Sequence, residues 1–153
     1  ANPREAAAYT FGYNHALFAK RVHDLLTMIA FVRNHEEHPK AVYLVGLNGA
    51  GPWVAAARAQ AGNQVTRAAI DSQNFRFGQV GELLDPSFLP GGAKYGDLPG
   101  FLSLSAPHAL WLSGEGPASE LIQAAYAAAD AADALTLYDG TTPTHAAIDW
   151  LLQ

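Results

Sequence analysis

A glycine-rich run directly after an apolar stretch is the segment of this chain most suited to chemistry. Residues 46–51 are Gly-Leu-Asn-Gly-Ala-Gly, and they follow the short β-branched stretch at 41–45. A strand that ends in such a turn can bind a dinucleotide through the pattern G-x-G-x-x-G, with an acidic residue about 20 positions later. It can also lift a nucleophile above a sheet through the pattern G-x-S-x-G. Asn48 stands where the first pattern needs glycine and where the second needs serine.

Three interpretations of this run follow from Asn48. Asp71 lies at a suitable distance for ribose recognition, so dinucleotide binding stays open as an alternative, although we predict that the chain uses no cofactor. In the nucleophile pattern the turn is degenerate, because a carboxamide cannot attack a substrate at neutral pH. The third interpretation is an ordinary tight turn, since Asn and Gly both favour turns.

Aromatic and histidine side chains supply the other candidates. Phe75, Phe77 and Tyr95 lie in the long irregular region 72–100, near the expected carboxyl ends of strands, where folds of this class bind ligands. We predict that they line an apolar substrate pocket, the alternative being that they cover the core. The segment 35–38, His-Glu-Glu-His, has a spacing that could hold a metal ion, but a solvated helix end explains it as well. We predict no metal site.

Apolar periodicity predicts the elements that must position these residues. Short apolar stretches predict four strands, near 41–46, 65–70, 109–113 and 134–139. Helical spacing predicts helices before, between and after them, at 14–34, 52–59, 119–132 and 146–152. Because strands alternate with helices, we predict a three-layer α/β fold. Its parallel sheet has about four strands in chain order, with helices on both faces.

Composition limits the classes of partner. The chain has 153 residues, of which 50% are hydrophobic and 15% charged, so it is long enough for one domain with a sizeable core. Its formal net charge of -5 disfavours a nucleic-acid partner, and its apolar stretches are too short for a membrane partner. It has no cysteine, which excludes disulfides and thiolate chemistry. Nothing in the sequence indicates a cellular location.

Several segments together carry a resemblance to a known family. They are 41–51, 95–99, 104–112, 113–116 and 135–140 with a histidine beyond, and the most particular is the Tyr-x-Asp-Leu … Ala-Pro-x-x-Leu run. Over roughly residues 12–153, the chain resembles the carboxyl-terminal half of an α/β-hydrolase of the dienelactone-hydrolase and acetyl-xylan-esterase-like kind. The early strands of that fold, and the loop that gives half of its oxyanion hole, have no counterpart in this sequence.

The resemblance implies roles for particular residues. Asn48 falls on the nucleophile position, and the backbone N–H of Gly49 is implied as an oxyanion donor. The base is implied to be His145, in the loop after the last strand. The family's acid position falls on Pro117, with Glu115 nearby, and Asp71 at the end of the second strand is another candidate acid.

The function that the resemblance implies is hydrolysis of a small-molecule carboxylic ester, either an acyl or a sugar ester. The alternative is a non-catalytic pseudo-hydrolase that serves as a binding or scaffold domain, because Asn48 and Pro117 both depart from the family pattern. We treat residues 1–153 as a single hydrolase-like domain that lacks the early strands. The stretch 41–45 would then form an unpaired apolar edge, so we expect either a homodimer that covers it or a missing amino-terminal half.

Overall fold

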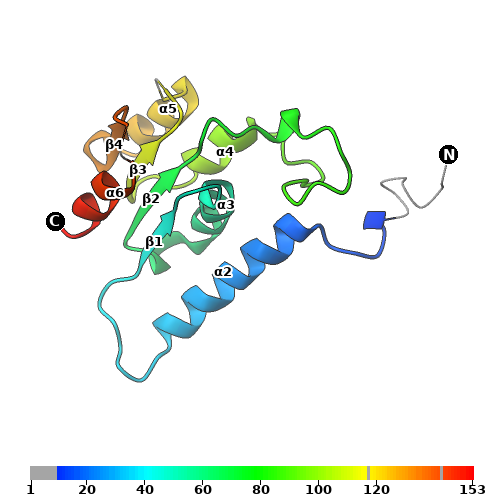
Figure 1. Cartoon of the computed structure of the whole chain (residues 1–153). Coiled ribbons are helices and arrows are strands. Elements are labelled where there is room, and N and C mark those ends of the chain that lie inside the picture. The colour runs from blue at the N-terminus through cyan, green and yellow to red at the C-terminus, as the bar shows by residue number, and fades with distance from the viewer. Residues whose placement is uncertain (1–9, 117, 142) are drawn as a thin grey trace.

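A computed structural model describes residues 10–116, 118–141 and 143–153 of the chain. Its centre is a sheet of four parallel strands, which are β1 (Tyr43–Gly46), β2 (Arg67–Asp71), β3 (Ala109–Ser113) and β4 (Leu135–Tyr138). The strands lie side by side in chain order, as Figure 1 shows. The predicted α/β fold with a parallel sheet of four strands is therefore confirmed.

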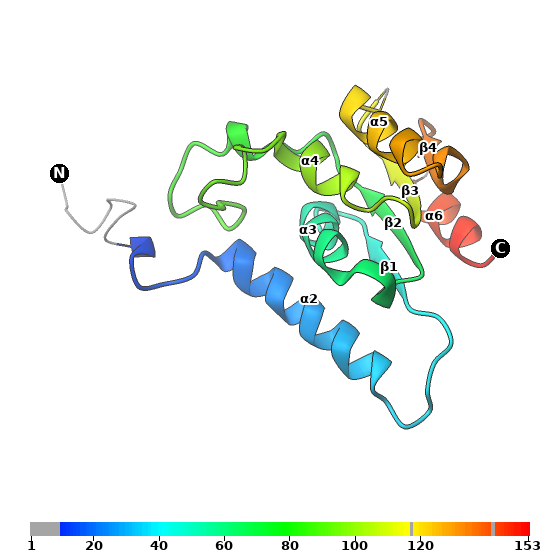
Figure 2. The same ribbon diagram turned by 180° about the vertical axis from the view of Figure 1, so that it is seen from behind.

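Five helices with described bounds lie around the sheet within residues 17–151. They are α2 (Leu17–Arg33), α3 (Gly51–Ala61), α4 (Asp97–Ser103), α5 (Glu120–Ala128) and α6 (Pro143–Leu151), and short 3-10 turns lie at Gly62–Gln64, Phe77–Gln79 and Ala132–Ala134. The helices that connect consecutive strands are α3, α4 and α5. Right-handed connections between strands in chain order bring all three to one face of the sheet. Figure 2 shows α2 at the periphery, beyond α3.

Alternate residues of the central strands build two cores, one on each face. Ala68 and Ile70 of β2 belong to a large cluster with residues of α3, α4 and α5, whereas Ala69 belongs to a smaller cluster with Ala147 and Leu151 of α6. Successive side chains of a strand point to opposite faces, so α6 covers the face opposite to α3, α4 and α5. The layers are therefore helix, sheet and helix.

Two helices begin earlier than the sequence analysis predicted. The α4 helix spans Asp97–Ser103 and so begins inside the region 72–100, which was expected to be irregular. The α6 helix begins at Pro143, three residues before the predicted start. Proline is favoured in the first turn of a helix because its fixed φ matches the helix and its missing N–H has no partner there. His145 consequently lies in the first turn of α6 and not in a loop.

The β1 side of the sheet is less covered than its centre. Tyr43 and Val45 are 45% and 40% exposed, and they share the face on which α6 packs against β2 and β3. Within the described part of the chain, no strand pairs with the outer edge of β1. Across the same residues, no helix is long and apolar enough to cross a membrane.

Candidate functional site

The turn after β1 places Asn48 at its apex. The backbone N–H of Ala50 donates a hydrogen bond of 3.0 Å to the carbonyl of Leu47, which closes a four-residue turn. Both central residues have positive φ, 51° at Asn48 and 89° at Gly49, as in the type I′ turns that favour an Asn-Gly pair. Asn48 and Gly49 are exposed at the carboxyl end of β1, immediately before α3. The ordinary-turn interpretation therefore describes the local geometry, and the apex residue is the one that the sequence pattern predicted.

Glycine at the start of α3 allows this turn to lie directly against β2. A Cβ atom on Gly51 would collide with the backbone carbonyl of Asp71, the last residue of β2. A Cβ atom on Gly46 would lie 2.8 Å from the Cβ of Val54 in α3, which is closer than side chains pack. The glycines of this run therefore serve close packing of strand end, turn and helix, and they bring the turn next to Asp71.

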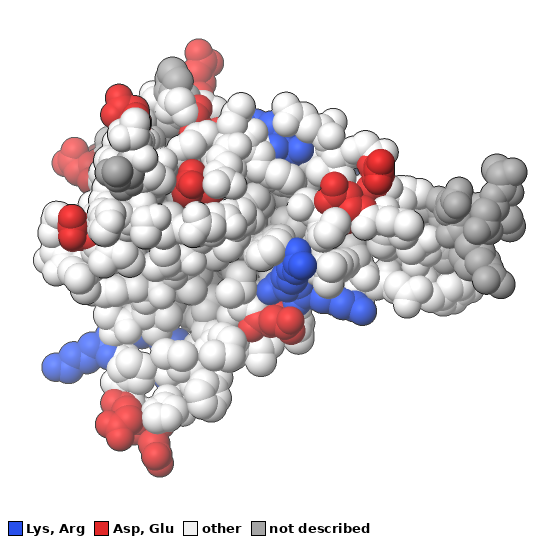
Figure 3. Space-filling model, viewed as in Figure 1, with Lys and Arg blue, Asp and Glu red and all other residues white. Residues whose placement is uncertain are grey.

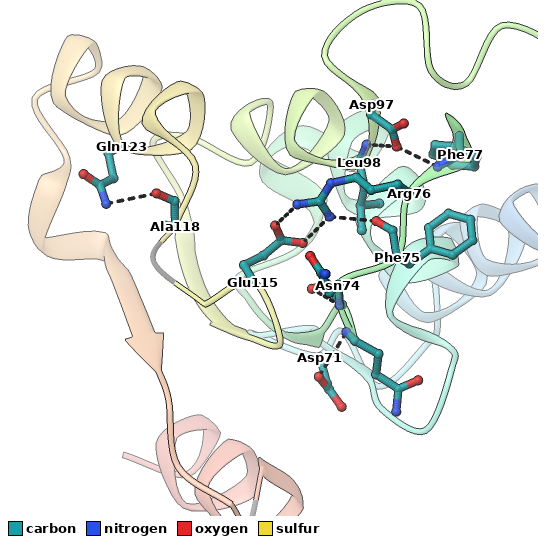
Figure 4. A network of polar contacts seen from close by, with 12 residues as sticks. Asp71, Asn74, Phe75, Arg76, Phe77, Asp97, Leu98, Glu115, Ala118 and Gln123 are labelled. Carbon is teal, nitrogen blue, oxygen red and sulfur yellow. Dashed lines mark hydrogen bonds and ion pairs between the residues drawn. The ribbon is translucent and has the colours of Figure 1, made fainter. Parts of the chain in front are cut away.

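The two candidate acids have different surroundings. Figure 4 shows the Glu115 carboxylate directed at the guanidinium of Arg76, whereas the Asp71 carboxylate points the other way. Both oxygens of Glu115 accept hydrogen bonds from Arg76, at 3.0 and 2.7 Å, and the Glu115 side chain is only 2% exposed. The Glu115 carboxylate is thus held in an ion pair with Arg76. Pro117, the position that matches the family acid, lies outside the described residues.

Asp71 is the candidate acid on the same side of the sheet as α6. Asp71 and Ala69 share a face of β2, and Ala69 packs in the α6 cluster. The Oδ1 atom of Asp71 accepts one hydrogen bond, of 3.3 Å, from the backbone N–H of Gln73. The side chain is buried at 8% exposure.

The chain neighbours of Asn48 and His145 pack in one apolar cluster. Leu47 precedes Asn48 and Ala146 follows His145, and both pack against the buried residues of the α6 cluster. Since α6 begins after the carboxyl end of β4, its first turn lies at the edge of the sheet where the other strands end. His145 is exposed there. The structure thus places Asn48, Asp71 and His145 at one edge and on one side of the sheet.

A polar cavity of about 350 Å³ lies beside the turn. Its lining includes backbone of Gly49 together with amide, hydroxyl and aromatic side chains; the lining residues are Gly49, Pro52, Ser72, Gln73, Asn74, Phe75, Gln79 and Ser87. The sequence analysis missed the amides of this lining, because exposed Gln and Asn in a long loop give no distinctive signal. It also missed Arg76, whose partner is 39 residues away in the chain.

Of the three aromatic residues predicted to line a pocket, only Phe75 lines this cavity. Phe77 is buried in the core on the α3 side, where its ring centre lies 5.0 Å from that of Phe18. Tyr95 is 79% exposed, with the Nζ of Lys94 5.0 Å from its ring centre. The cavity is therefore lined mainly by polar groups, whereas the prediction was of an apolar pocket.

A larger groove, of about 610 Å³, lies between α2 and α3. Its walls include the apolar residues Phe18 and Leu26 and the exposed histidines His15 and His23. None of the residues predicted from the sequence as catalytic or substrate-binding lines it. The candidate chemistry therefore lies at the carboxyl edge of the sheet and not in the groove.

The perturbed titratable groups form a separate cluster beside the start of β3. Burial raises the pKa of Tyr126, whose hydroxyl donates a 2.8 Å hydrogen bond to the backbone carbonyl of His108. Burial lowers the pKa of Arg58, which donates hydrogen bonds to the backbone carbonyls of Gly62 and Ser105 at the ends of two helices. Burial, and then the charge of Arg58, lower the pKa of His108. The cluster lies at the amino end of β3, away from the candidate site. Its hydrogen bonds join α3 and α5 to the segment that precedes β3.

The start of α3 is poorly suited to a dinucleotide. Phosphate groups bind at helix N-termini through free backbone N–H groups, and Pro52 removes one of these from the first turn. Among the described residues, no group of three or more His, Asp or Glu side chains is placed to hold a metal ion. Comparisons of the chain with protein-family models, with curated proteins and with solved structures found no match.

Proposed function

We propose that this chain is an α/β-hydrolase-like domain that hydrolyses a small carboxylic ester at the carboxyl edge of its sheet. One observation carries the proposal: the Asn48 turn, Asp71 and the first turn of α6 with His145 share one edge and one side of the sheet, and Gly49 of that turn lines a cavity of about 350 Å³. Ligands of open parallel sheets bind outside the carboxyl ends of the strands. The resemblance to the carboxyl-terminal half of an α/β-hydrolase supports the same location.

The residues at this edge favour direct attack by water, because Asn48 is not a nucleophile. His145 takes a proton from water as the water oxygen bonds to the ester carbonyl carbon, and Asp71 orients the imidazole. The Gly49 N–H and the Asn48 carboxamide donate hydrogen bonds to the carbonyl oxygen as it gains negative charge. The carbon–alkoxy bond then breaks, and the leaving alcohol receives its proton from His145.

The cavity indicates an uncharged polar substrate. Its lining residues carry amides, hydroxyls and an aromatic ring, and all of them are uncharged side chains. On the face seen in Figure 3, charged side chains are dispersed and broad uncharged areas lie between them. These features fit a neutral acyl or sugar ester better than a strongly charged one.

The second candidate is a non-catalytic relative that binds a ligand at the same edge. Two observations favour it: the apex of the turn carries a carboxamide, and both oxygens of Glu115 are held by Arg76. Such a domain would bind a ligand in the cavity without hydrolysing it. The two candidates share a binding site and differ only in turnover.

Turnover of p-nitrophenyl acetate separates the candidates. The parent is compared with His145→Ala and Asn48→Ser, and His15→Ala, an exposed histidine outside the site, is the matched control. The hydrolase proposal predicts turnover in the parent and in His15→Ala that is lost in His145→Ala. Turnover that appears only in Asn48→Ser supports the non-catalytic relative. Parent turnover that survives His145→Ala contradicts the proposed mechanism.

A further inference from the structure

We propose that Asn48 and Gly49 form a site of spontaneous deamidation, which replaces the carboxamide at the apex of the turn by a carboxylate. The inference concerns a covalent change in the chain itself and does not depend on the proposed function. It rests on the geometry of two adjacent residues and on what lies directly after them.

The reacting atoms are unobstructed. Asn48 and Gly49 are both exposed, and no heavy atom lies within 4 Å of the place where a Cβ of Gly49 would stand. Among the described residues, no group hydrogen-bonds the Asn48 carboxamide or accepts a hydrogen bond from the Gly49 N–H. One hydrogen bond, from Ala50 to Leu47, closes the turn, so the Asn48–Gly49 peptide can rotate without breaking a larger network.

The chemistry needs only these residues and water. The backbone nitrogen of Gly49 bonds to the Cγ of Asn48, and the Cγ–Nδ2 bond breaks. The nitrogen leaves as ammonia and takes up the proton that the Gly49 amide loses. Water then opens the resulting five-membered imide at one of its two carbonyls. The products are aspartate or isoaspartate at position 48, and the mass rises by about one dalton, since a carboxyl replaces a carboxamide.

The start of α3 favours the carboxylate once it has formed. Ala50, the residue before the helix, provides no side-chain hydrogen bond to the first turn, so the turn lacks a cap. Negative charge is stabilised near the N-terminus of a helix by the partial positive charge of the unpaired N–H groups. A carboxylate at position 48 also supplies an ionisable, nucleophilic oxygen beside the cavity, which the carboxamide lacks.

The chain contains a matched internal control at Asn74. Asn74 is exposed like Asn48 and has a φ of 54°, close to the 51° of Asn48, but a phenylalanine follows it, and the N–H of that Phe75 donates a 3.0 Å hydrogen bond to the carbonyl of Ser72. The purified protein is incubated at mildly alkaline pH, and the peptides around both residues are mapped by mass spectrometry at intervals. We expect deamidation at Asn48 to be at least about ten times faster than at Asn74, because glycine leaves the attacking nitrogen open. Equal rates at the two residues would overturn the proposal.

Two variants test the charge change and the stabilisation. The parent should gain an acidic band on isoelectric focusing during the same incubation, and Asn48→Gln should not, since its longer side chain cannot form the five-membered imide. An acidic band of equal intensity in Asn48→Gln would place the reaction elsewhere and overturn the assignment. Asn48→Asp should melt no lower than the parent if α3 favours the carboxylate, and a lower melting temperature would contradict that step.

Discussion

At the scale of single residues, the pairing of Arg76 with Glu115 decides which acid remains for the candidate site. Glu115 follows the end of β3, and its carboxylate is buried against the Arg76 guanidinium and directed away from Asp71. Asp71 keeps a single hydrogen bond to its Oδ1 atom from the backbone of Gln73. Of the two acids that the sequence offered, Asp71 is therefore the one that no arginine or lysine pairs with among the described residues, and it is the one that the proposed mechanism uses.

The Arg76–Glu115 pair should raise the free energy of unfolding by a measurable amount. In Arg76→Ala the Glu115 carboxylate stays buried without its partner, so we expect the free energy of unfolding to fall by about 2 kcal/mol. Urea denaturation at neutral pH measures the change, with Lys94→Ala, an exposed lysine, as the control. The double variant Arg76→Ala/Glu115→Gln should recover part of the loss, since it no longer buries a charge. A loss in the double variant that equals the sum of the single losses would contradict a coupled pair.

Tyr126 should make the protein lose stability in alkali. Burial raises its pKa above the ordinary value of 10.0, so between that value and the folded-state pKa the folded chain holds a proton that the unfolded chain releases. Stability is therefore fully present below about pH 10 and falls as the pH rises further. Tyr126→Phe should cost about 1 kcal/mol at neutral pH, through loss of the hydrogen bond to the His108 carbonyl. Denaturation at pH 8 and pH 10.5 should show a smaller alkaline loss in Tyr126→Phe, and an equal loss would exclude Tyr126 as its source.

At the scale of elements, the sequence predicted strands better than helix ends. The four strands are short and mostly apolar, a pattern that depends only on local residues. The start of α6 was placed three residues too late, because the prediction did not use Pro143, which is favourable in a first turn. The position of Phe77 was not predictable for a different reason: whether a loop aromatic lines a cavity or enters the core depends on α2, whose Phe18 it contacts.

The contact between the end of β2 and the start of α3 should tolerate no side chain at Gly51. A Cβ there would collide with the backbone carbonyl of Asp71, and no side-chain rotation can move either atom, so the strand and the helix must separate. We expect Gly51→Ala to lower the free energy of unfolding by at least about 2 kcal/mol, as in other overpacked cores. Gly81→Ala is the matched control, because open space surrounds Gly81. Equal denaturation midpoints for the two variants would contradict the close approach.

At the scale of the whole molecule, the outer edge of β1 has no partner strand among the described residues. Parallel sheets are normally covered on both faces, whereas Tyr43 and Val45 are 45% and 40% exposed. We propose that this edge pairs with a strand of a second copy of the chain. The unpaired edge was expected from the resemblance, whose early strands have no counterpart in this sequence, but the sequence did not predict which partner covers it.

Light scattering tests self-association through this edge. A second copy at β1 predicts a mass about twice the 16.2 kDa of the chain. A charge at a sheet edge opposes pairing, so Val45→Lys should return the protein to the monomer mass. Leu84→Lys is the control, since Leu84 is 80% exposed in a loop away from the sheet. A parent that stays monomeric at high concentration would contradict self-association through this edge.

The most direct test of the account is the location at which a small ester binds. Backbone amide chemical shifts are followed by NMR during titration with phenyl acetate on the His145→Ala variant, which the mechanism predicts to bind without turnover. We predict that the largest shifts fall on Gly49, Ser72 and Asn74 at the carboxyl edge of the sheet. Shifts concentrated on His15 and His23 in the groove between α2 and α3, or no shifts at either place, would contradict a binding site at that edge.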